Sequence, residues 1–228
     1  MKELTDRIAE IKGEIYRPYR IVIRFTERVY GGLLADAEAM EKYLAAKFSP
    51  EDPTREAVKA DLDLDKEQEN MTTVFKRDAH GLYLGNHQIK AMLAQSASTL
   101  GITSKKRGSK QTFKEGCIVN GIGSDDADTG RKLYFHPNRE KADGIETITG
   151  NVQTPQGSRS ILKASEYVEK AELKFCFAPL VNRVALSGKG LTEKDILTIL
   201  VNGQNTGLGS LRSLEEGKFE ILEFSPPA

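Results

Sequence analysis

The sequence predicts an α+β fold in which strands and two helices alternate along a single domain, residues 1–228. Three observations lead to this class. Residues 19–28 alternate between apolar and other side chains, as a half-buried strand does. Apolar residues repeat at helical spacing from Ile89 to Leu100, and residues 191–228 read as a helix, a glycine-bearing loop and a strand.

The first strand is predicted over residues 19–28, because Ile21, Ile23 and Phe25 fall on one face. The pair Gly31-Gly32 then breaks it.

The first helix follows Gly85, because Ile89, Met92 and Leu93 form an apolar stripe and Gly101 is suited to end it. A second strand is predicted over 113–119 and a third over 171–178. Phe113, at the start of the second, is interpreted as a core residue rather than as a stacking platform.

The last helix is predicted over 192–202, where Thr192 and Asp195 have the spacing of a capping box. Gly203 stands where a left-handed C-cap belongs. A final strand over 218–224 completes a β-α-β-β-α-β order, which indicates a ferredoxin-like (RRM-like) antiparallel sheet with two helices on one face.

Two insertions interrupt this order. Residues 36–69 are acidic and helix-prone, and we interpret them as an acidic helical insertion. Residues 120–163 form a hairpin insertion, with strands at 147–152 and 159–163 around the turn at 154–157.

A cluster of positive charge follows the first helix. It comprises Lys105, Lys106, Arg107, Lys110 and Lys114, with only Glu115 opposing them. A basic segment with glycine and serine between its charges is suited to tracking a phosphate backbone. A solvated loop without a ligand is the alternative.

The loop G-x-G-S-x-R-S-x-x-x-G-K-F-E, from Gly207 to Glu220, resembles the C-terminal signature of the RAMP superfamily, the RNA-binding subunits of CRISPR effector complexes. In that family a glycine-rich loop joins the second helix of a ferredoxin-like unit to its last strand. The resemblance implies that Gly207 and Gly209 let the backbone approach RNA, and that Arg212 holds phosphate. A plain helix-to-strand turn is the alternative, with Arg212 paired to Glu215 or Glu216.

Two further segments resemble the same family. The segment from Gly81 to Leu93 is similar to its strand, tight turn and first helix, although the family's proline and serines are missing and Ala91 replaces a glycine. Residues 165–177 resemble its central strand.

The resemblance implies a non-catalytic, single-stranded RNA-binding subunit that assembles repetitively along a guide-type RNA. The partners would be RNA and either further copies of the chain or other effector subunits. Lys90 joins the basic cluster and Arg212 as an expected phosphate ligand. The family's hairpin insertions act as thumbs that reach a neighbouring subunit, so the resemblance also implies a candidate thumb at 120–163.

Two alternatives stay open. A virus-encoded mimic of such a subunit would block or cap an effector complex through protein contacts. A metal-independent endoribonuclease would use His80 and His87, near Tyr83 and Lys90, as an acid–base pair. The family's catalytic aspartate is not transferred to Asp36, because the surrounding motif is absent.

Composition sets the remaining expectations. The 33 basic and 33 acidic residues cancel, so no global charge favours nucleic acid or a membrane. Cys117 and Cys176 stand in apolar company without paired histidines, which favours buried thiols in a reducing cytoplasm and no zinc framework. No cofactor, metal or catalytic residue is assigned.

Overall fold

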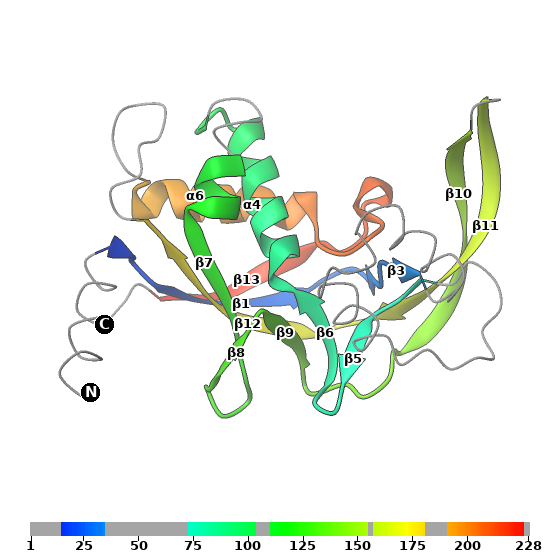
Figure 1. Cartoon of the computed structure of the whole chain (residues 1–228), viewed down its shortest axis with the longest axis horizontal. Coiled ribbons are helices and arrows are strands. Elements are labelled where there is room, and N and C mark those ends of the chain that lie inside the picture. Colours follow the sequence, from blue (N-terminus) through cyan, green and yellow to red (C-terminus); the bar gives the residue numbers. More distant parts are fainter. Residues whose placement is uncertain (1–14, 35–72, 104–109, 155–156, 181–190, 226–228) are drawn as a thin grey trace, which may run out of the picture.

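The computed structural model describes residues 15–34, 73–103, 110–154, 157–180 and 191–225. In this part of the chain an eight-stranded sheet carries two helices, α4 (Asn86–Thr99) and α6 (Glu193–Thr206), on one face (Figure 1). A second sheet of five strands lies at one end of the larger sheet. The predicted α+β class, with two helices and a mostly antiparallel sheet, is confirmed. The acidic segment 36–69 lies outside the described residues.

Four strands form the centre of the larger sheet. β1 (Tyr19–Phe25) lies between β12 (Glu172–Pro179) and β13 (Phe219–Ser225), and it is antiparallel to both. β7 (Cys117–Ile122) pairs antiparallel with the other edge of β12. The strand order is therefore β13–β1–β12–β7.

Four short strands extend the larger sheet, and two hairpins lie among them. β8 (Asp128–Gly130) pairs with β7, and β9 (Lys132–His136) pairs with the start of β12. β6 (Gly81–Gly85) joins β9 to β5 (Lys76–Asp78), and all these pairings are antiparallel. The two hairpins are β7–β8 and β5–β6.

The second sheet is built on a long hairpin of β10 (Gly144–Thr154) and β11 (Gly157–Val168), which stands out from the body in Figure 1. β2 (Val29–Tyr30) and β4 (Thr73–Val74) pair with β11, and β3 (Leu33–Leu34) pairs with β4. The hairpin predicted from the turn at 154–157 exists, but its strands are longer than 147–152 and 159–163. Backbone pairing continues on both sides to Gly144 and Tyr167.

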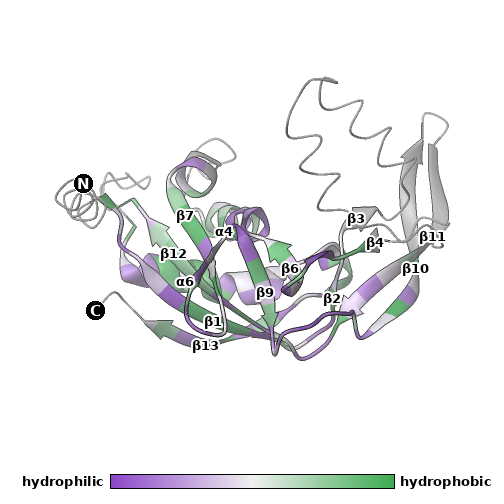
Figure 2. Ribbon diagram, turned by 60° about the horizontal axis from the view of Figure 1, so that its bottom comes forward, coloured by the Kyte–Doolittle hydropathy of each residue, from purple (hydrophilic) through white to green (hydrophobic). Residues whose placement is uncertain are grey.

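The core lies between the helices and the sheet. Ile21, Ile23 and Phe25 of β1 are at most 1% exposed, and Ile89 and Ile199 from the two helices are fully buried. Figure 2 shows the matching alternation of apolar and polar residues along the central strands. The strand predicted from this alternation is confirmed, although it ends at Phe25 instead of residue 28.

The segment predicted as a strand over 113–119 divides into two elements. Residues Lys110–Glu115 form a π-helix, η1, and β7 begins only at Cys117. The interpretation of Phe113 as a core residue is confirmed, because it is 1% exposed and its ring stacks on Phe177 with centroids 6.4 Å apart. The helical turn places this ring in the core.

The end of the last helix differs from the prediction. The capping box is present, since Thr192 Oγ1 accepts from the Asp195 amide at 3.1 Å and the Asp195 carboxylate accepts from the Thr192 amide at 2.9 Å. However, α6 runs past Gly203 to Thr206, and Gly207 caps it with a φ of 71°. Gly203 instead allows close helix packing, because a Cβ there would lie 2.4 Å from Met92 Sδ.

Glu166 of β11 joins the two sheets. The residue is 7% exposed, and its carboxylate accepts from Arg77 Nη2 at 2.6 Å and from the Phe75 amide at 2.9 Å. Its backbone carbonyl accepts from the Gly31 amide at 3.0 Å. Glu166 therefore fixes the base of the hairpin to β5 and to the turn after β2.

The two cysteines differ in their surroundings. Cys117 is buried and Cys176 is half-buried on the sheet. Burial raises the pKa of the Cys117 thiol to about 12, and burial also raises the pKa of Cys176. Among the described residues, no group of three or more histidine, cysteine or acidic side chains could hold a metal ion. None of the described helices is long and apolar enough to cross a membrane.

Candidate nucleic-acid interface

The glycine loop after α6, residues 207–212, packs against the backbone that follows β2. The Ser210 amide donates to the Tyr30 carbonyl at 3.3 Å, and the Ser210 hydroxyl donates to the Gly31 carbonyl at 2.7 Å. The Leu208 amide donates to Gly217 at 2.9 Å, which closes the loop on itself. Backbone contacts thus hold the loop in place.

Both predicted glycines adopt conformations that other residues rarely take. Gly207 and Gly209 have φ angles of 71° and 88°. A Cβ on Gly207 would lie 2.5 Å from the Glu216 carbonyl oxygen, and one on Gly209 would lie 2.9 Å from the Tyr30 carbonyl oxygen. Close approach within the protein therefore requires these glycines. Their predicted role in admitting an RNA backbone stays a prediction.

Arg212 begins the short 3₁₀ helix η2 (Arg212–Leu214), and its guanidinium donates to Gln95 Oε1 of α4 at 3.3 Å. Within the described part of the chain it forms no ion pair. The alternative pairing with Glu215 is not found, because Glu215 accepts from Lys218 Nζ at 2.8 Å. Glu216 is half-buried and one of its carboxylate oxygens has no hydrogen-bond partner.

The loop, the turn after β2 and the first turn of α4 enclose a pocket of about 290 Å³, named here the glycine-loop pocket. Its lining combines main chain with a few polar side chains: Gly32, His87, Gln88, Ala91, Leu208, Gly209, Ser210 and Arg212. The pocket therefore brings together residues from three parts of the sequence.

The electrostatics of this pocket favour an anion. α4 starts at Gly85 without a side-chain cap, and its first turn contains no acidic residue. The positive end of the helix dipole and the Arg212 guanidinium both lie at the pocket. Gln88 Oε1 is buried and has no hydrogen-bond partner among the described residues. As an acceptor it can bind a hydrogen-bond donor of a ligand, and it does not contribute to anion binding.

Lys90 lies one turn further along α4 and takes part in internal contacts. Its ammonium donates to the Cys117 carbonyl at 2.8 Å and so links α4 to the start of β7. It does not line the glycine-loop pocket. The structure gives Lys90 a structural contact, and its role as a phosphate ligand stays a prediction.

The basic cluster is only partly covered by the structure. Lys105, Lys106 and Arg107 lie outside the described residues. Lys110 and Lys114 belong to η1, which packs beside α4, but their side chains lie outside the described ones. The described end of the segment, η1, therefore lies next to α4, the helix whose first turn lines the pocket.

The histidines considered for catalysis are separated. His87 lines the glycine-loop pocket, whereas His80 lies in the turn between β5 and β6 and lines another pocket. Tyr83 is buried and packs against Tyr134, with ring centroids 5.6 Å apart. These residues do not form one acid–base pair of the kind that the endoribonuclease alternative needs.

Sequence reasoning missed His87, Gln88 and Ser210 as pocket residues. Ser210 belongs to the loop motif from Gly207 to Glu220, but its contact with Gly31 depends on the pairing of strands that are distant in the sequence. The sequence signal that could have indicated His87 and Gln88 is their position in the first turn of a helix whose N-cap is a glycine, because the amides of such a turn lack a side-chain cap.

Comparison with known proteins gives a limited likeness. No family model matches the chain, and no curated protein matches it. Among solved structures the chain is similar to one in the cryo-EM structure of the Type III-B Cmr-beta bound to cognate target RNA. The two are 12% identical with a TM-score of 0.44, over 99% of this chain and 66% of that chain. This chain thus spans less than two thirds of the length of that neighbour, and a likeness at this level assigns no residue a role.

Proposed function

We propose that this chain is a RAMP-type, non-catalytic protein that binds single-stranded RNA and assembles repetitively along a guide-type RNA, with the glycine-loop pocket as a phosphate site. One observation carries the proposal. Two of the segments that resemble the family, 81–93 and 207–220, are more than a hundred residues apart in the sequence, yet both line this pocket. The alternative, a plain helix-to-strand turn, does not explain why these two segments line the same pocket.

The order of the strands supports the same reading. A ferredoxin-like β-α-β-β-α-β unit places its last strand beside its first, its third on the other side of the first, and its second outside the third. With β1, β7, β12 and β13 as the four strands, the observed order β13–β1–β12–β7 fits this arrangement. The third resembling segment, 165–177, then supplies the central strand β12.

On the face of the sheet that the helices do not cover, the arginines of β1 are less available to RNA than Arg212 is on the glycine-loop side. Arg20 donates to Asp126 at 2.7 Å and lies 3.4 Å from Glu223. Arg24 likewise lies 2.7 Å from Glu172 and 3.6 Å from a second carboxylate. Both guanidinium groups of β1 are therefore already neutralised, whereas Arg212 has a neutral partner. We place the RNA backbone at the glycine loop, at the first turn of α4 and along the basic segment that follows α4.

Binding of a fluorescent single-stranded RNA to Arg212→Ala tests this site. Removing a charge-assisted hydrogen bond to phosphate should weaken binding by about 1–3 kcal/mol. Lys218→Ala is the matched control, because it removes one positive charge from the same loop region at a side chain that pairs with Glu215. It should bind RNA as the wild type does. Equal effects of the two variants would leave only a non-specific charge effect and would exclude the site.

The salt dependence of the same assay tests the basic segment. Replacing Lys105, Lys106 and Arg107 together by alanine should reduce the slope of log affinity against log salt by roughly 2, at about 0.7 for each single-strand phosphate. An unchanged slope would remove these residues from the interface. Wild-type protein that does not bind RNA at about 50 mM salt, yet co-purifies with effector subunits after RNA digestion, would favour the mimic instead.

A further inference from the structure

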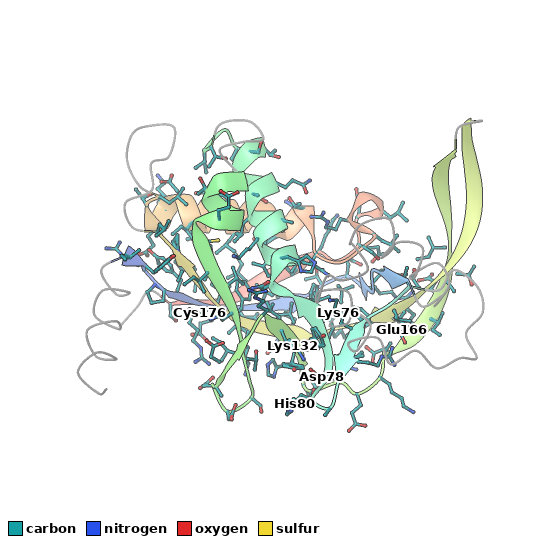
Figure 3. All side chains as sticks on the ribbon, viewed as in Figure 1. Lys76, Asp78, His80, Lys132, Glu166 and Cys176 are labelled. Carbon is teal, nitrogen blue, oxygen red and sulfur yellow. The ribbon has the colours of Figure 1, made fainter. Side chains whose placement is uncertain are left out.

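A second pocket, of about 560 Å³, shares no lining residue with the glycine-loop pocket. The turn between β5 and β6 contributes His80, and β9 contributes Tyr134 and His136. The turn after β7 and the start of β8 contribute residues 123–125 and 127–129. Figure 3 shows His80 at the end of the β5–β6 hairpin, beyond Asp78. We name this space the three-turn pocket. Its volume lies in the range of about 300–1,000 Å³ that is usual for small-molecule sites.

The charged side chains of the three-turn pocket are hydrogen-bond acceptors. Asp128 accepts from the Gly130 amide at 2.6 Å and from the Asn120 side chain at 2.9 Å. Asp125 uses only one oxygen, for a backbone amide at 3.3 Å, so its second oxygen is available among the described residues. The Thr129 hydroxyl donates to a backbone carbonyl at 2.6 Å and therefore presents its oxygen as an acceptor too.

No lysine or arginine occurs among the described residues that line the three-turn pocket. A phosphate or carboxylate ligand would meet the charges of Asp125 and Asp128 without compensation. A ligand with N–H donors would instead be bound by them.

Aromatic rings form one wall of the pocket. His80 meets Tyr134 edge-on with ring centroids 6.0 Å apart, and the Tyr134 hydroxyl is held by Asp78 at 2.7 Å. His136 lies 3.3 Å from the Ile122 carbonyl through Nε2, which must carry the hydrogen because a carbonyl only accepts. Burial lowers the pKa of His136, although this hydrogen bond acts in the opposite direction. The lowered pKa favours the neutral ring, in which Nδ1 is a further acceptor.

We propose that the three-turn pocket binds a guanine base, with the carboxylate of Asp125 accepting from its N1–H and 2-amino groups. Guanine presents these two donors side by side, which matches the two oxygens of a carboxylate. Uracil presents one donor between two acceptors and would be repelled. The rings of His80 and Tyr134 suit a planar ligand. This proposal does not rest on the proposed function, because it concerns different residues.

An arginine side chain from a protein partner also presents two parallel donors to a carboxylate. It carries no acceptor, however, and would leave the Asn138 amide and the Ser124 hydroxyl of the lining without a ligand partner. Guanine offers O6 and N7 as acceptors to such donors. The mixed lining therefore favours the base over the guanidinium.

Titration of the ¹⁵N-labelled chain with nucleosides, which carry no phosphate, tests the proposal. Guanosine should shift the amide resonances of residues 123–129 and of His136. Inosine, which lacks the 2-amino group, should bind at least about tenfold more weakly, because one hydrogen bond to a charged group is lost. Uridine should cause no comparable shifts. Agmatine serves as the probe for a guanidinium ligand.

Two variants in the same turn complete the test. Asp125→Asn should weaken guanosine binding by at least about tenfold and abolish the difference between guanosine and inosine. Asp126→Asn is the control, because Asp126 carries the same charge but pairs with Arg20 and does not line the pocket. It should leave the affinity within about twofold. Three results would each overturn the proposal: no shifts with guanosine at about 1 mM, equal binding of all three nucleosides, or stronger binding of agmatine than of guanosine.

Discussion

Replacing Gly209 by alanine should destabilise the protein more than the same change at Gly101. Both glycines have left-handed φ angles, 88° at Gly209 and 68° at Gly101. They differ in their surroundings. A Cβ at Gly209 would lie 2.9 Å from both the Tyr30 carbonyl oxygen and Val29 Cγ2, whereas a Cβ at Gly101 would meet nothing within 4 Å.

The magnitudes follow from this difference. An alanine held in the left-handed region costs about 1–2 kcal/mol, and this is the whole expected cost at Gly101. At Gly209 the loop must also move away from β2, which breaks the hydrogen bond from the Ser210 amide to Tyr30 at a further cost of about 1 kcal/mol. Relief of the two close contacts adds to this. We therefore expect a total of about 2–4 kcal/mol at Gly209.

Urea denaturation of wild type and both variants measures these costs from the midpoints, provided that the slopes agree. Equal destabilisation by the two changes would refute the reasoning. It would mean that the close packing of the glycine loop on β2 contributes nothing to stability.

Three further predictions concern the stability of the fold, its dependence on pH and the accessibility of the two thiols. Glu166→Ala should lower the free energy of unfolding by about 2–3 kcal/mol in urea denaturation, because it leaves a buried amide and a guanidinium without their acceptor; a loss below about 0.5 kcal/mol would contradict this. Asp78 is half-buried, and burial alone would raise its pKa, but hydrogen bonds from Lys132, Tyr134 and a backbone amide outweigh this effect and lower the pKa. Its stabilising effect should therefore be present above the unfolded pKa of about 3.9 and be lost as pH falls below it. The urea midpoint of Asp78→Asn should accordingly fall less than that of the wild type as the pH is lowered. In native protein, a thiol reagent should modify half-buried Cys176 well before Cys117, whose pKa is raised to about 12; equal rates would contradict the burial of Cys117.

Elements with a strong local pattern could be predicted from the sequence. The alternation at Ile21, Ile23 and Phe25 located β1, and Thr192 with Asp195 located the start of α6. Gly101 was correctly placed at the end of α4, where it has a positive φ. In each case the residues that determine the structure lie within a few positions of one another.

Features that depend on distant partners could not be predicted. Gly203 looked like a helix end, yet its missing side chain accommodates Met92 of the other helix. The short strands β2 and β4 depend on β11 for a pairing partner, and β3 in turn pairs with β4. The glycine-loop pocket belongs to the same class. Gly209 and Arg212 were recognised in the sequence, but the residues that face them across the pocket come from α4.

The contacts of Gly31 give the hairpin and the glycine loop a common point of attachment. The Gly31 amide donates to the Glu166 carbonyl of β11, and its own carbonyl accepts from the Ser210 hydroxyl. A neighbouring protein that binds the hairpin and shifts β11 would therefore also shift Gly31, to which the glycine loop is bonded. By thermodynamic reciprocity, a ligand that holds the loop in one position would change the affinity for that neighbour by the same factor. If copies of the chain assemble along one strand as proposed, this coupling would make their binding cooperative.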